Sequence, residues 1–187
     1  MIFRYKHLVR LLDLDDEFII DLQYYKSSNF FKKKFYSENE CFLHESTAFR
    51  LIKAKNAFKR EGLFVKIWDA YRPVSVQAKM WETLPDNNFV AYPPSKDNKT
   101  YKYSHMNGQC VDLTLVDKNY RNVPMPTAFD DFSEKAGLDN NPDSIEKSNA
   151  LLLKDTMIEC GFTPYKNEWW HFYDKNEAPK EYLDFIF

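Results

Sequence analysis

The chain has 187 residues, 44% hydrophobic and 17% aromatic, so one domain with a sizeable core is expected over residues 1–187. Lys and Arg total 26 against 28 Asp and Glu, which argues against a nucleic-acid partner bound through its phosphates. No segment has the run of about 20 apolar residues that crosses a bilayer, and three cysteines do not make a disulfide framework. We therefore expect a cytoplasmic protein, or a periplasmic one if a signal peptide has been removed.

The first third of the chain predicts a strand, a long helix and a second strand. Residues 18–22 are typical of a strand, and residues 27–29 of a turn. Apolar side chains recur at helical spacing from residue 45 to residue 60, and Gly62 suits the end of that helix. Residues 63–68 predict a strand that ends before Pro73, because proline has no N–H to give to a sheet.

The rest of the chain alternates long loops with regular elements, and no repeat or linker marks a domain boundary. Residues 111–115 alternate like a half-buried strand. In chain order we further expect a helix over 75–84, a loop over 85–103, a turn over 117–122, a polar loop over 133–144, a helix from Asp143, with Glu146 in a capping-box-like start, to Cys160, and a strand over 168–173.

The first candidate metal ligands lie in the stretch from Ser104 to Asp112. Six residues separate His105 from Asp112, and Asp112 lies within the predicted strand. A histidine at the mouth of a strand and an aspartate inside it can converge on one point. Zinc accepts such mixed nitrogen and oxygen coordination, and a catalytic zinc site needs three protein ligands and one open position.

The third ligand is most plausibly His171, because His7 and His44 lie in sequence that suggests structural or surface roles. Glu168 precedes His171 by three residues, and a metallohydrolase needs a carboxylate beside the attacking water to move its proton. In a regular strand, residues three apart point to opposite faces, so Glu168 must lie at a bend or before the strand starts. The alternative is that His171 is a satisfied histidine among core aromatics.

Several other polar residues have a functional and a structural interpretation. Arg72 could stabilise a developing oxyanion or form a salt bridge with Asp69. Asp130 or Asp131 could bind a substrate ammonium, or either could be a solvated loop acid. Cys110 is more consistent with a small buried residue than with a thiolate near zinc, and Ser104 lacks a third partner that would make it a nucleophile.

Four blocks of the sequence, taken together and in order, resemble the D-alanyl-D-alanine dipeptidases, a family of zinc enzymes typified by those of vancomycin resistance. They are Asp69-Ala70-Tyr71-Arg72-Pro73, Ser104-His105 through Gly108 to Val111-Asp112-Leu113-Thr114-Leu115, Met125-Pro126-Thr127-Ala128-Phe129-Asp130, and Gly161-Phe162 with Tyr165 and Glu168-Trp169-Trp170-His171-Phe172. Three positions differ from the family pattern. Ala70 and Pro126 replace glycines, and Tyr103 replaces a serine that helps to hold the substrate in the resistance enzymes.

The resemblance implies an α+β fold, a single domain with a central, mostly antiparallel sheet flanked by helices. It implies one Zn²⁺ per chain bound by His105, Asp112 and His171, with Glu168 as general base and acid and Arg72 as the oxyanion stabiliser. The substrate contacts it suggests are Asp130 for the free ammonium, and Ser104, Tyr103 and Tyr71.

The predicted function is therefore hydrolysis of D-alanyl-D-alanine, or a close D,D-dipeptide, by a zinc dipeptidase. One alternative is a peptidoglycan D,D- or L,D-carboxypeptidase, which needs an open cleft and is usually exported. Another is a catalytically silent zinc-dependent module that binds wall peptides, although binding alone needs neither Glu168 nor Arg72. The sequence leaves the oligomeric state and the biological role open.

Overall fold

The computed structural model describes residues 1–94, 100–140 and 143–187. Its larger sheet has five strands in the order β3-β5-β6-β8-β7, and all neighbours are antiparallel except β3 and β5. The bounds are Ile19–Ile20 for β3, Phe64–Asp69 for β5, Cys110–Val116 for β6, Phe162–Tyr165 for β7 and Glu168–Asp174 for β8. The predicted α+β class with a central, mostly antiparallel sheet is confirmed.

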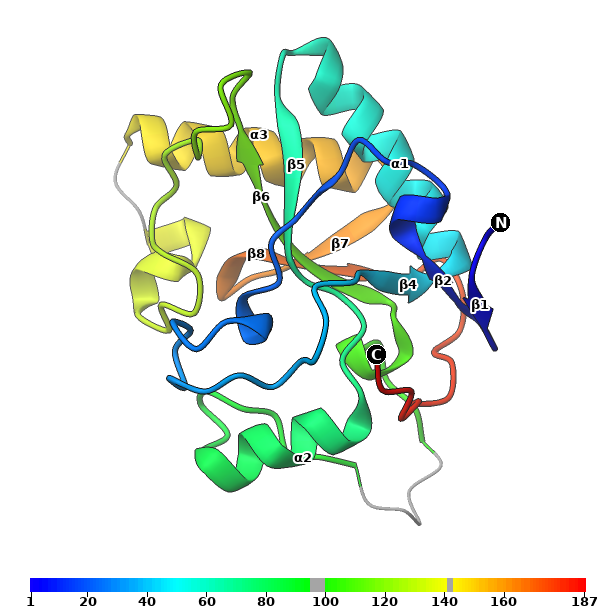
Figure 1. Ribbon diagram of the computed structural model, residues 1–187. Coiled ribbons are helices and arrows are strands. Elements are labelled where there is room, and N and C mark those ends of the chain that lie inside the picture. The colour runs from blue at the N-terminus through cyan, green and yellow to red at the C-terminus, as the bar shows by residue number, and fades with distance from the viewer. Residues whose placement is uncertain (95–99, 141–142) are drawn as a thin grey trace.

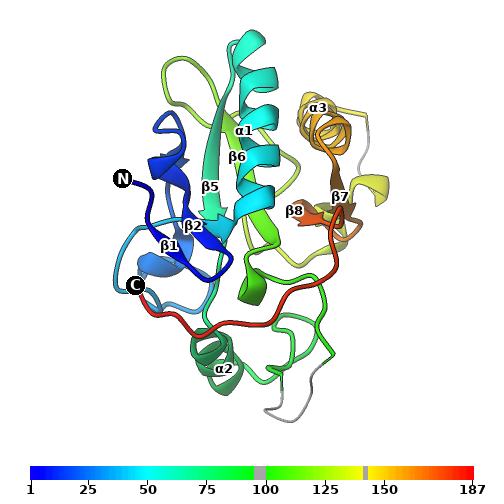
Figure 2. The same cartoon turned by 90° about the vertical axis from the view of Figure 1, so that its right-hand side faces the viewer.

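A smaller antiparallel sheet is formed by the N-terminal part of the chain, and the C-terminal segment packs against it. It consists of β1 (Arg4–Tyr5), β2 (Leu8–Arg10) and β4 (Phe42–His44). The C-terminal segment runs back along the molecule to this sheet (Figures 1 and 2), where Phe185 stacks on Phe3 and Tyr5. The aromatic residues at the two ends of the chain therefore pack together.

Two long helices cover the same face of the larger sheet, and a shorter helix lies beyond the ends of its strands (Figures 1 and 2). The long helices are α1 (Glu45–Arg60) and α3 (Ile145–Glu159), and the short one is α2 (Val74–Thr83). The bounds predicted for α1 are confirmed, and Gly62 follows it with a φ of 72° that favours glycine. Within the described residues, no helix has both the length and the apolar character needed to cross a membrane.

Two details differ from the expectations, and a third prediction holds where the chain is described. The helix α3 begins after Ser144, whose side chain accepts a hydrogen bond from the Lys147 N–H, so Ser144 and not Asp143 is its N-cap. The predicted loop over 133–144 contains two short 3-10 turns, at Glu134–Ala136 and Leu138–Asn140, and residues 141–142 lie outside the described part. The loop over 85–103 has no helix or strand where it is described, but residues 95–99 fall outside that part.

The strand β6 is buried along its whole length, whereas the alternation of its residues predicted half-burial. It lies in the middle of the larger sheet between β5 and β8, so both of its edges are paired. The alternation fails as a guide because Asp112 and Thr114, which look like solvent-facing residues, are turned into the protein. A buried carboxylate needs polar or charged partners, which directs attention to what surrounds Asp112.

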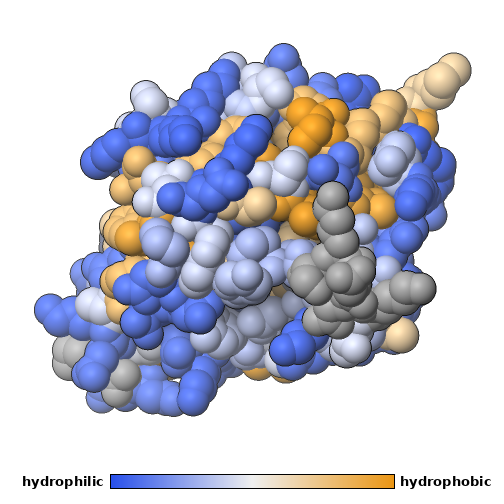
Figure 3. All heavy atoms as spheres, turned by 90° about the horizontal axis from the view of Figure 1, so that it is seen from below, coloured by the Kyte–Doolittle hydropathy of each residue, from blue (hydrophilic) through white to orange (hydrophobic). Residues whose placement is uncertain are grey.

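The surface is mixed. Seen from below, hydrophilic side chains dominate, and apolar surface shows between them in one part of the face (Figure 3).

Candidate active site

The sheet register brings Asp112 and His171 together. Asp112 of β6 lies directly opposite His171 of β8 in the antiparallel ladder. His105 opens the short 3-10 turn His105–Asn107 just before β6, and Ser104 caps this turn by accepting from the Met106 N–H. Two neighbouring strands and the turn that leads into one of them thus supply three side chains to one point.

Gly108 makes the turn between His105 and β6 possible. Its φ is 70°, a conformation that L side chains rarely adopt, and a Cβ there would lie 2.6 Å from the backbone nitrogen of His44. The backbone at Gly108 is also bonded to β4, since its carbonyl accepts from the His44 N–H. The glycine in the sequence motif is therefore required by both conformation and packing.

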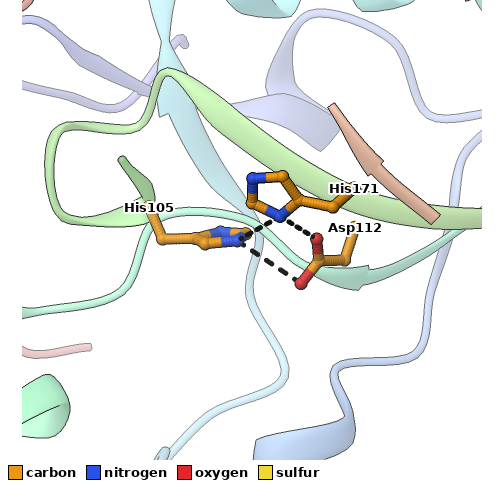
Figure 4. Close-up of side chains that lie close together, drawn as sticks. All are labelled: His105, Asp112 and His171. Carbon is orange, nitrogen blue, oxygen red and sulfur yellow. Dashed lines mark hydrogen bonds and ion pairs between the residues drawn. The ribbon is translucent and has the colours of Figure 1, made fainter. Parts of the chain in front are cut away.

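The three side chains form a tight cluster (Figure 4). His171 Nδ1 lies 2.7 Å from Asp112 Oδ1, His105 Nε2 lies 3.4 Å from Asp112 Oδ2, and the two ring nitrogens are 3.3 Å apart. One candidate ligand atom from each residue lies within 4.8 Å of the other two, and all three residues are buried. Two imidazole nitrogens and a carboxylate are the donor types that zinc takes in catalytic sites.

The surroundings of each histidine leave the required lone pair facing the cluster. His105 Nδ1 lies 2.6 Å from the Ala70 carbonyl oxygen and donates to it, so Nε2 keeps its lone pair. His171 Nε2 is buried and has no hydrogen-bond partner among the described residues, while Nδ1 faces Asp112. A neutral His171 protonated at Nε2 would present Nδ1 to a metal. The donor set therefore fits a zinc ion.

Asp112 is held as a carboxylate. Burial alone would raise the pKa of Asp112, but the charges and hydrogen bonds of His105 and His171 lower it below its ordinary value. Burial alone would likewise lower the pKa of His105, which Asp112 and Asp69 instead raise. In the absence of a metal ion, the negative charges of Asp112 and Asp69 therefore favour a positive charge on His105, the same sign that a metal ion would bring.

Glu168 reaches the same cavity because the strand pairing is irregular at its start. Pro164 of β7 pairs with Phe172, but the next residue, Tyr165, pairs with Glu168, so β8 has extra residues at this point. Such a bulge changes the direction of side chains, and Glu168 and His171 line one cavity although they are three residues apart. The irregular pairing at Glu168 therefore provides the bend that Glu168 needs in order to face the same cavity as His171.

The carboxyl group of Glu168 is set up to exchange a proton near neutrality. Burial raises the pKa of Glu168 to about 7, with smaller contributions from the negative charges of Asp112 and Asp130. His171 and Arg72 oppose the rise. A group that titrates near neutrality can act both as a general base and as a general acid.

Arg72 both forms the predicted salt bridge and faces the cavity. Its Nε and Nη2 donate to Asp69 Oδ2 at 3.0 and 2.6 Å, and its guanidinium lies over the Tyr24 ring at 5.1 Å. Asp69 ends β5 opposite Asp112, and the Arg72 N–H donates to the His105 carbonyl. The structural interpretation of Arg72 is therefore correct and does not exclude the functional one, because Arg72 also lines the cavity with His105.

The two neighbouring acids of the 124–132 loop have different surroundings. Asp130 is buried, has a φ of 58°, and accepts hydrogen bonds from the Tyr24 hydroxyl at 3.1 Å on both of its oxygens. Burial, helped by Asp112, raises the pKa of Asp130 to about 7. Asp131 instead accepts from the Ser133 N–H outside the cavity. Of the two sequence candidates, Asp130 is the one beside the cluster.

These groups surround a cavity of about 240 Å³. Its other walls come from the 85–94 segment, from Phe132 and from aromatic side chains of β7 and β8, namely Tyr165, Trp170 and Tyr173. Past Glu168 the cavity adjoins a second hollow of about 460 Å³, with which it shares Asn88, Phe132, Tyr165 and Glu168. The small compartment next to the cluster is thus open on the Glu168 side.

Three of the sequence candidates lie outside this lining. Tyr71 is in the core, where its hydroxyl accepts from the Phe185 N–H; the Tyr103 hydroxyl donates to the Glu177 carbonyl; and Ser104 caps its turn. None of the three lines the cavity, and their role as substrate contacts stays a prediction. The rings of His7 and His44 lie tilted against each other, with 5.3 Å between centroids, away from the cluster, and Cys110 is buried.

Sequence reasoning did not identify Tyr24 or Tyr173 as residues of the site. Tyr24 bonds Asp130 across 106 residues of chain, and no local pattern could have signalled this. Tyr173 could have been found, because it lies two residues after His171 and so shares its face of the strand. Its ring lies edge-on to His171 at 4.6 Å between centroids, and Tyr165 approaches the same imidazole at 5.8 Å.

Comparisons with known proteins agree with the sequence blocks. A family model described as D-Ala-D-Ala dipeptidase matches residues 4–187. A D-alanyl-D-alanine dipeptidase of Escherichia coli (strain K12) is 32% identical, over 88% of this chain and 83% of that protein. One of Enterococcus faecium is 35% identical, over 72% of this chain and 74% of that protein. Among solved structures, the LD-carboxypeptidase LdcB is 16% identical with a TM-score of 0.49, over 92% of this chain and 69% of that one.

Proposed function

The chain belongs to the D-Ala-D-Ala dipeptidase family of metallopeptidases, and we propose that it hydrolyses D-alanyl-D-alanine to two molecules of D-alanine with one zinc ion per chain. The observation that supports this most strongly is the convergence of His105, Asp112 and His171 within 4.8 Å, in a cavity that also holds Glu168. A bound zinc ion would polarise the substrate carbonyl and lower the pKa of a water molecule.

Glu168 is proposed to move the proton. As a carboxylate it takes a proton from the attacking water, and as a carboxylic acid it gives this proton to the nitrogen of the leaving D-alanine. Burial raises the pKa of Glu168 to about 7 in the metal-free chain, which brings both forms within reach near neutrality. Its place beside His171 in the cavity wall brings it next to the cluster where the water would be activated.

Arg72 is proposed to stabilise the negative charge that develops on the carbonyl oxygen. A guanidinium has five N–H donors, and Arg72 uses three of them in bonds to Asp69 and Gln77. Arg72 therefore keeps at least one N–H donor for a ligand in the cavity. Donors fixed in advance where charge develops are the most effective kind, because nothing has to reorganise during the reaction.

Asp130 is proposed to bind the free ammonium group of the dipeptide. A buried carboxyl whose pKa is raised to about 7 gains most from a cationic partner, since the ammonium restores the stability of the ionised form. Tyr24 keeps both carboxylate oxygens in place. The acid therefore limits the cavity on the side of the substrate amino group.

This arrangement favours a dipeptidase over a carboxypeptidase. The compartment of about 240 Å³ is smaller than the ~300–1,000 Å³ of typical sites for drug-sized ligands. A stem peptide would extend on the amino side, where Asp130 and Tyr24 stand. We assign the hollow that opens past Glu168 to the side of the leaving residue.

The test measures release of free D-alanine from D-Ala-D-Ala, L-Ala-D-Ala and a tripeptide ending in D-Ala-D-Ala, each with and without a chelator. Cleavage of the free D,D-dipeptide alone, abolished by the chelator and restored by zinc, is the expected result. Cleavage of the tripeptide would favour a carboxypeptidase, and zinc-dependent binding without cleavage would favour the silent module. A cytoplasmic location stays a prediction from the sequence.

A further inference from the structure

Gln77 connects the guanidinium of Arg72 to the wall of the cavity. It lies on α2, its side chain is buried with 3% exposure, and its Oε1 accepts a hydrogen bond of 2.8 Å from Arg72 Nη1. Its Nε2 donates a hydrogen bond of 2.7 Å to the carbonyl oxygen of Ala91. The amide of Gln77 therefore links the guanidinium of Arg72 to the backbone at Ala91.

The bond from Gln77 completes the restraint on Arg72. Asp69 holds the Nε and Nη2 edge of the guanidinium, and is itself held by the Tyr36 hydroxyl, which donates to Oδ1 at 2.6 Å. Both bonds from the guanidinium to Asp69 end on the single oxygen Oδ2, so the rigid guanidinium could still pivot about that atom. The bond from Gln77 holds Nη1 and so sets the direction in which the guanidinium faces the cavity.

The second bond from Gln77 restrains the cavity wall. Asn87, Asn88, Phe89 and Ala91 line the cavity together with Glu168 and the histidines of the cluster. These residues belong to a segment without helix or strand, whose internal bonds, such as that from the Val90 N–H to Asp86, are local. The hydrogen bond to Ala91 ties this segment to α2 and so to the same anchor as Arg72.

Gln77 is chemically suited to this bridge. Arginine offers only donors and a backbone carbonyl is only an acceptor, so the bridging group needs an acceptor and a donor at its tip. The glutamine amide has both. A glutamate of the same shape would keep the acceptor but turn a second carboxylate oxygen toward the Ala91 carbonyl, and a methionine would lose both bonds.

We propose that Gln77 is a positioning residue for the peptidase reaction, which aims Arg72 into the cavity and holds the Asn87–Ala91 wall against it. This rests on the proposed function. Because one side chain restrains both groups, the geometry of the oxyanion donor and the shape of the substrate compartment depend on each other. Loss of the bond to Arg72 is expected to lower kcat, and loss of the bond to Ala91 is expected to raise KM.

The test compares two substitutions of similar size in the zinc-loaded full chain, with D-Ala-D-Ala as substrate. Gln77→Met removes both bonds and should lower kcat by about tenfold to a hundredfold, the cost of a displaced catalytic group, and raise KM. Gln77→Glu keeps the bond to Arg72 and loses that to Ala91, so KM should rise while kcat stays within a few fold of the wild type. Lys79→Met, an exposed position on α2, is the control for methionine on this helix and should behave like the wild type.

A double-mutant cycle with Arg72→Lys separates positioning from a general packing role. If Gln77 acts through Arg72, adding Gln77→Met to Arg72→Lys should lower kcat far less than it does alone. Thermal unfolding of each variant shows whether a loss follows from reduced stability.

Two results would overturn the inference while leaving the proposed function intact. One is a Gln77→Met enzyme with kcat and KM within twofold of the wild type. The other is a fall in kcat of the same size with and without Arg72. If Arg72→Lys has no measurable turnover, the comparison of kcat between Gln77→Met and Gln77→Glu tests the inference instead; equal losses of kcat in the two variants would overturn it. A wild-type protein that does not cleave D-Ala-D-Ala would instead refute the proposed function.

Discussion

The buried carboxyl groups that line the cavity form two sets in opposite states, named here by role: Asp112 with the two histidines is the ligand end, and Glu168 with Asp130 is the acid end. In the ligand end, two imidazoles hold the pKa of Asp112 below its ordinary value, despite burial. In the acid end, burial raises the pKa values of Glu168 and Asp130 to about 7, and the negative charge of Asp112 contributes to both shifts. The same functional group is thus kept ionised in one place and able to exchange a proton in another.

The two ends also differ in what positions them. Asp112 and His171 are paired across the central strands, where the backbone ladder fixes their separation. Glu168 depends on an irregularity where β8 begins, and Asp130 lies in a loop with positive φ and depends on Tyr24. The positions of Asp112 and His171 are therefore fixed by the sheet, whereas the protonation of Glu168 and Asp130 is set by burial and by neighbouring charges.

The strongest test of the ligand end is His171→Ala. Removing one of three ligands should weaken zinc binding by more than the ~10–100-fold that loss of a mere supporting partner costs, and activity should vanish with the metal. Zinc per chain is measured by atomic absorption after dialysis against a weak chelator. His7→Ala is the matched control, since His7 lies away from the cluster next to His44. A His171→Ala protein with full zinc content would remove His171 from the ligand set.

At the acid end, Glu168→Gln should separate proton transfer from metal binding. Turnover is expected to fall by about 10²–10⁴, the usual contribution of a general acid or base, while zinc content stays that of the wild type. The amide keeps the size of the side chain, so the cavity should be preserved. Steady-state kinetics and metal analysis on the same preparation check both halves of this prediction, and wild-type turnover would rule out the proposed role.

The ligand end was the more predictable from sequence. His105 and Asp112 lie within one short motif, and the glycine between them signals the turn that Gly108 makes with its φ of 70°. The helix over 45–60 was equally accessible, because its apolar spacing and terminal glycine are local features. Features that depend on residues close together in the chain can be predicted from a single sequence.

The acid end could not be derived in the same way. Regular strand geometry argues that Glu168 and His171 face opposite sides, and only the pairing of β7 with β8 reveals the bulge that overrides it. The contact of Tyr24 with Asp130 and the bond of Gln77 to Ala91 join segments that no periodic pattern relates. Burial of β6 on both faces likewise depends on neighbours distant in sequence, so its alternation predicted the wrong exposure.

Asp130→Asn should stabilise the metal-free protein at neutral and alkaline pH. Because the folded pKa is raised from 3.8 to about 7, the folded wild type binds this proton more tightly than the unfolded chain. Its stability therefore falls as pH rises through this window. Asparagine does not titrate, so the variant should gain up to about 4 kcal/mol over the wild type by pH 8 and nothing below pH 4. Urea unfolding at pH 4, 6 and 8 measures the difference; a gap independent of pH would show that Asp130 is not strained by its charge.

The smallest expected effect concerns the pH profile of kcat/KM, in the limb where activity falls toward acid pH. Glu168 must be ionised to accept a proton and Asp130 must be ionised to bind an ammonium, so activity should fall as pH drops through their pKa values. A cation in the cluster lowers both values, so the limb of the zinc-loaded enzyme should lie at or below pH 7. With two carboxyls required, its slope should approach two.

In Asp130→Asn one of these carboxyls is absent, so the slope of the limb should fall to one. The limb should also move to lower pH by less than one unit, because the negative charge of Asp130 no longer opposes ionisation of Glu168. Profiles of both enzymes from pH 5 to 9, with zinc content checked at each pH, provide the comparison. Identical limbs would mean that ionisation of Asp130 is not required for the reaction and does not affect the pKa of Glu168. The acid limb would then be due to Glu168 alone.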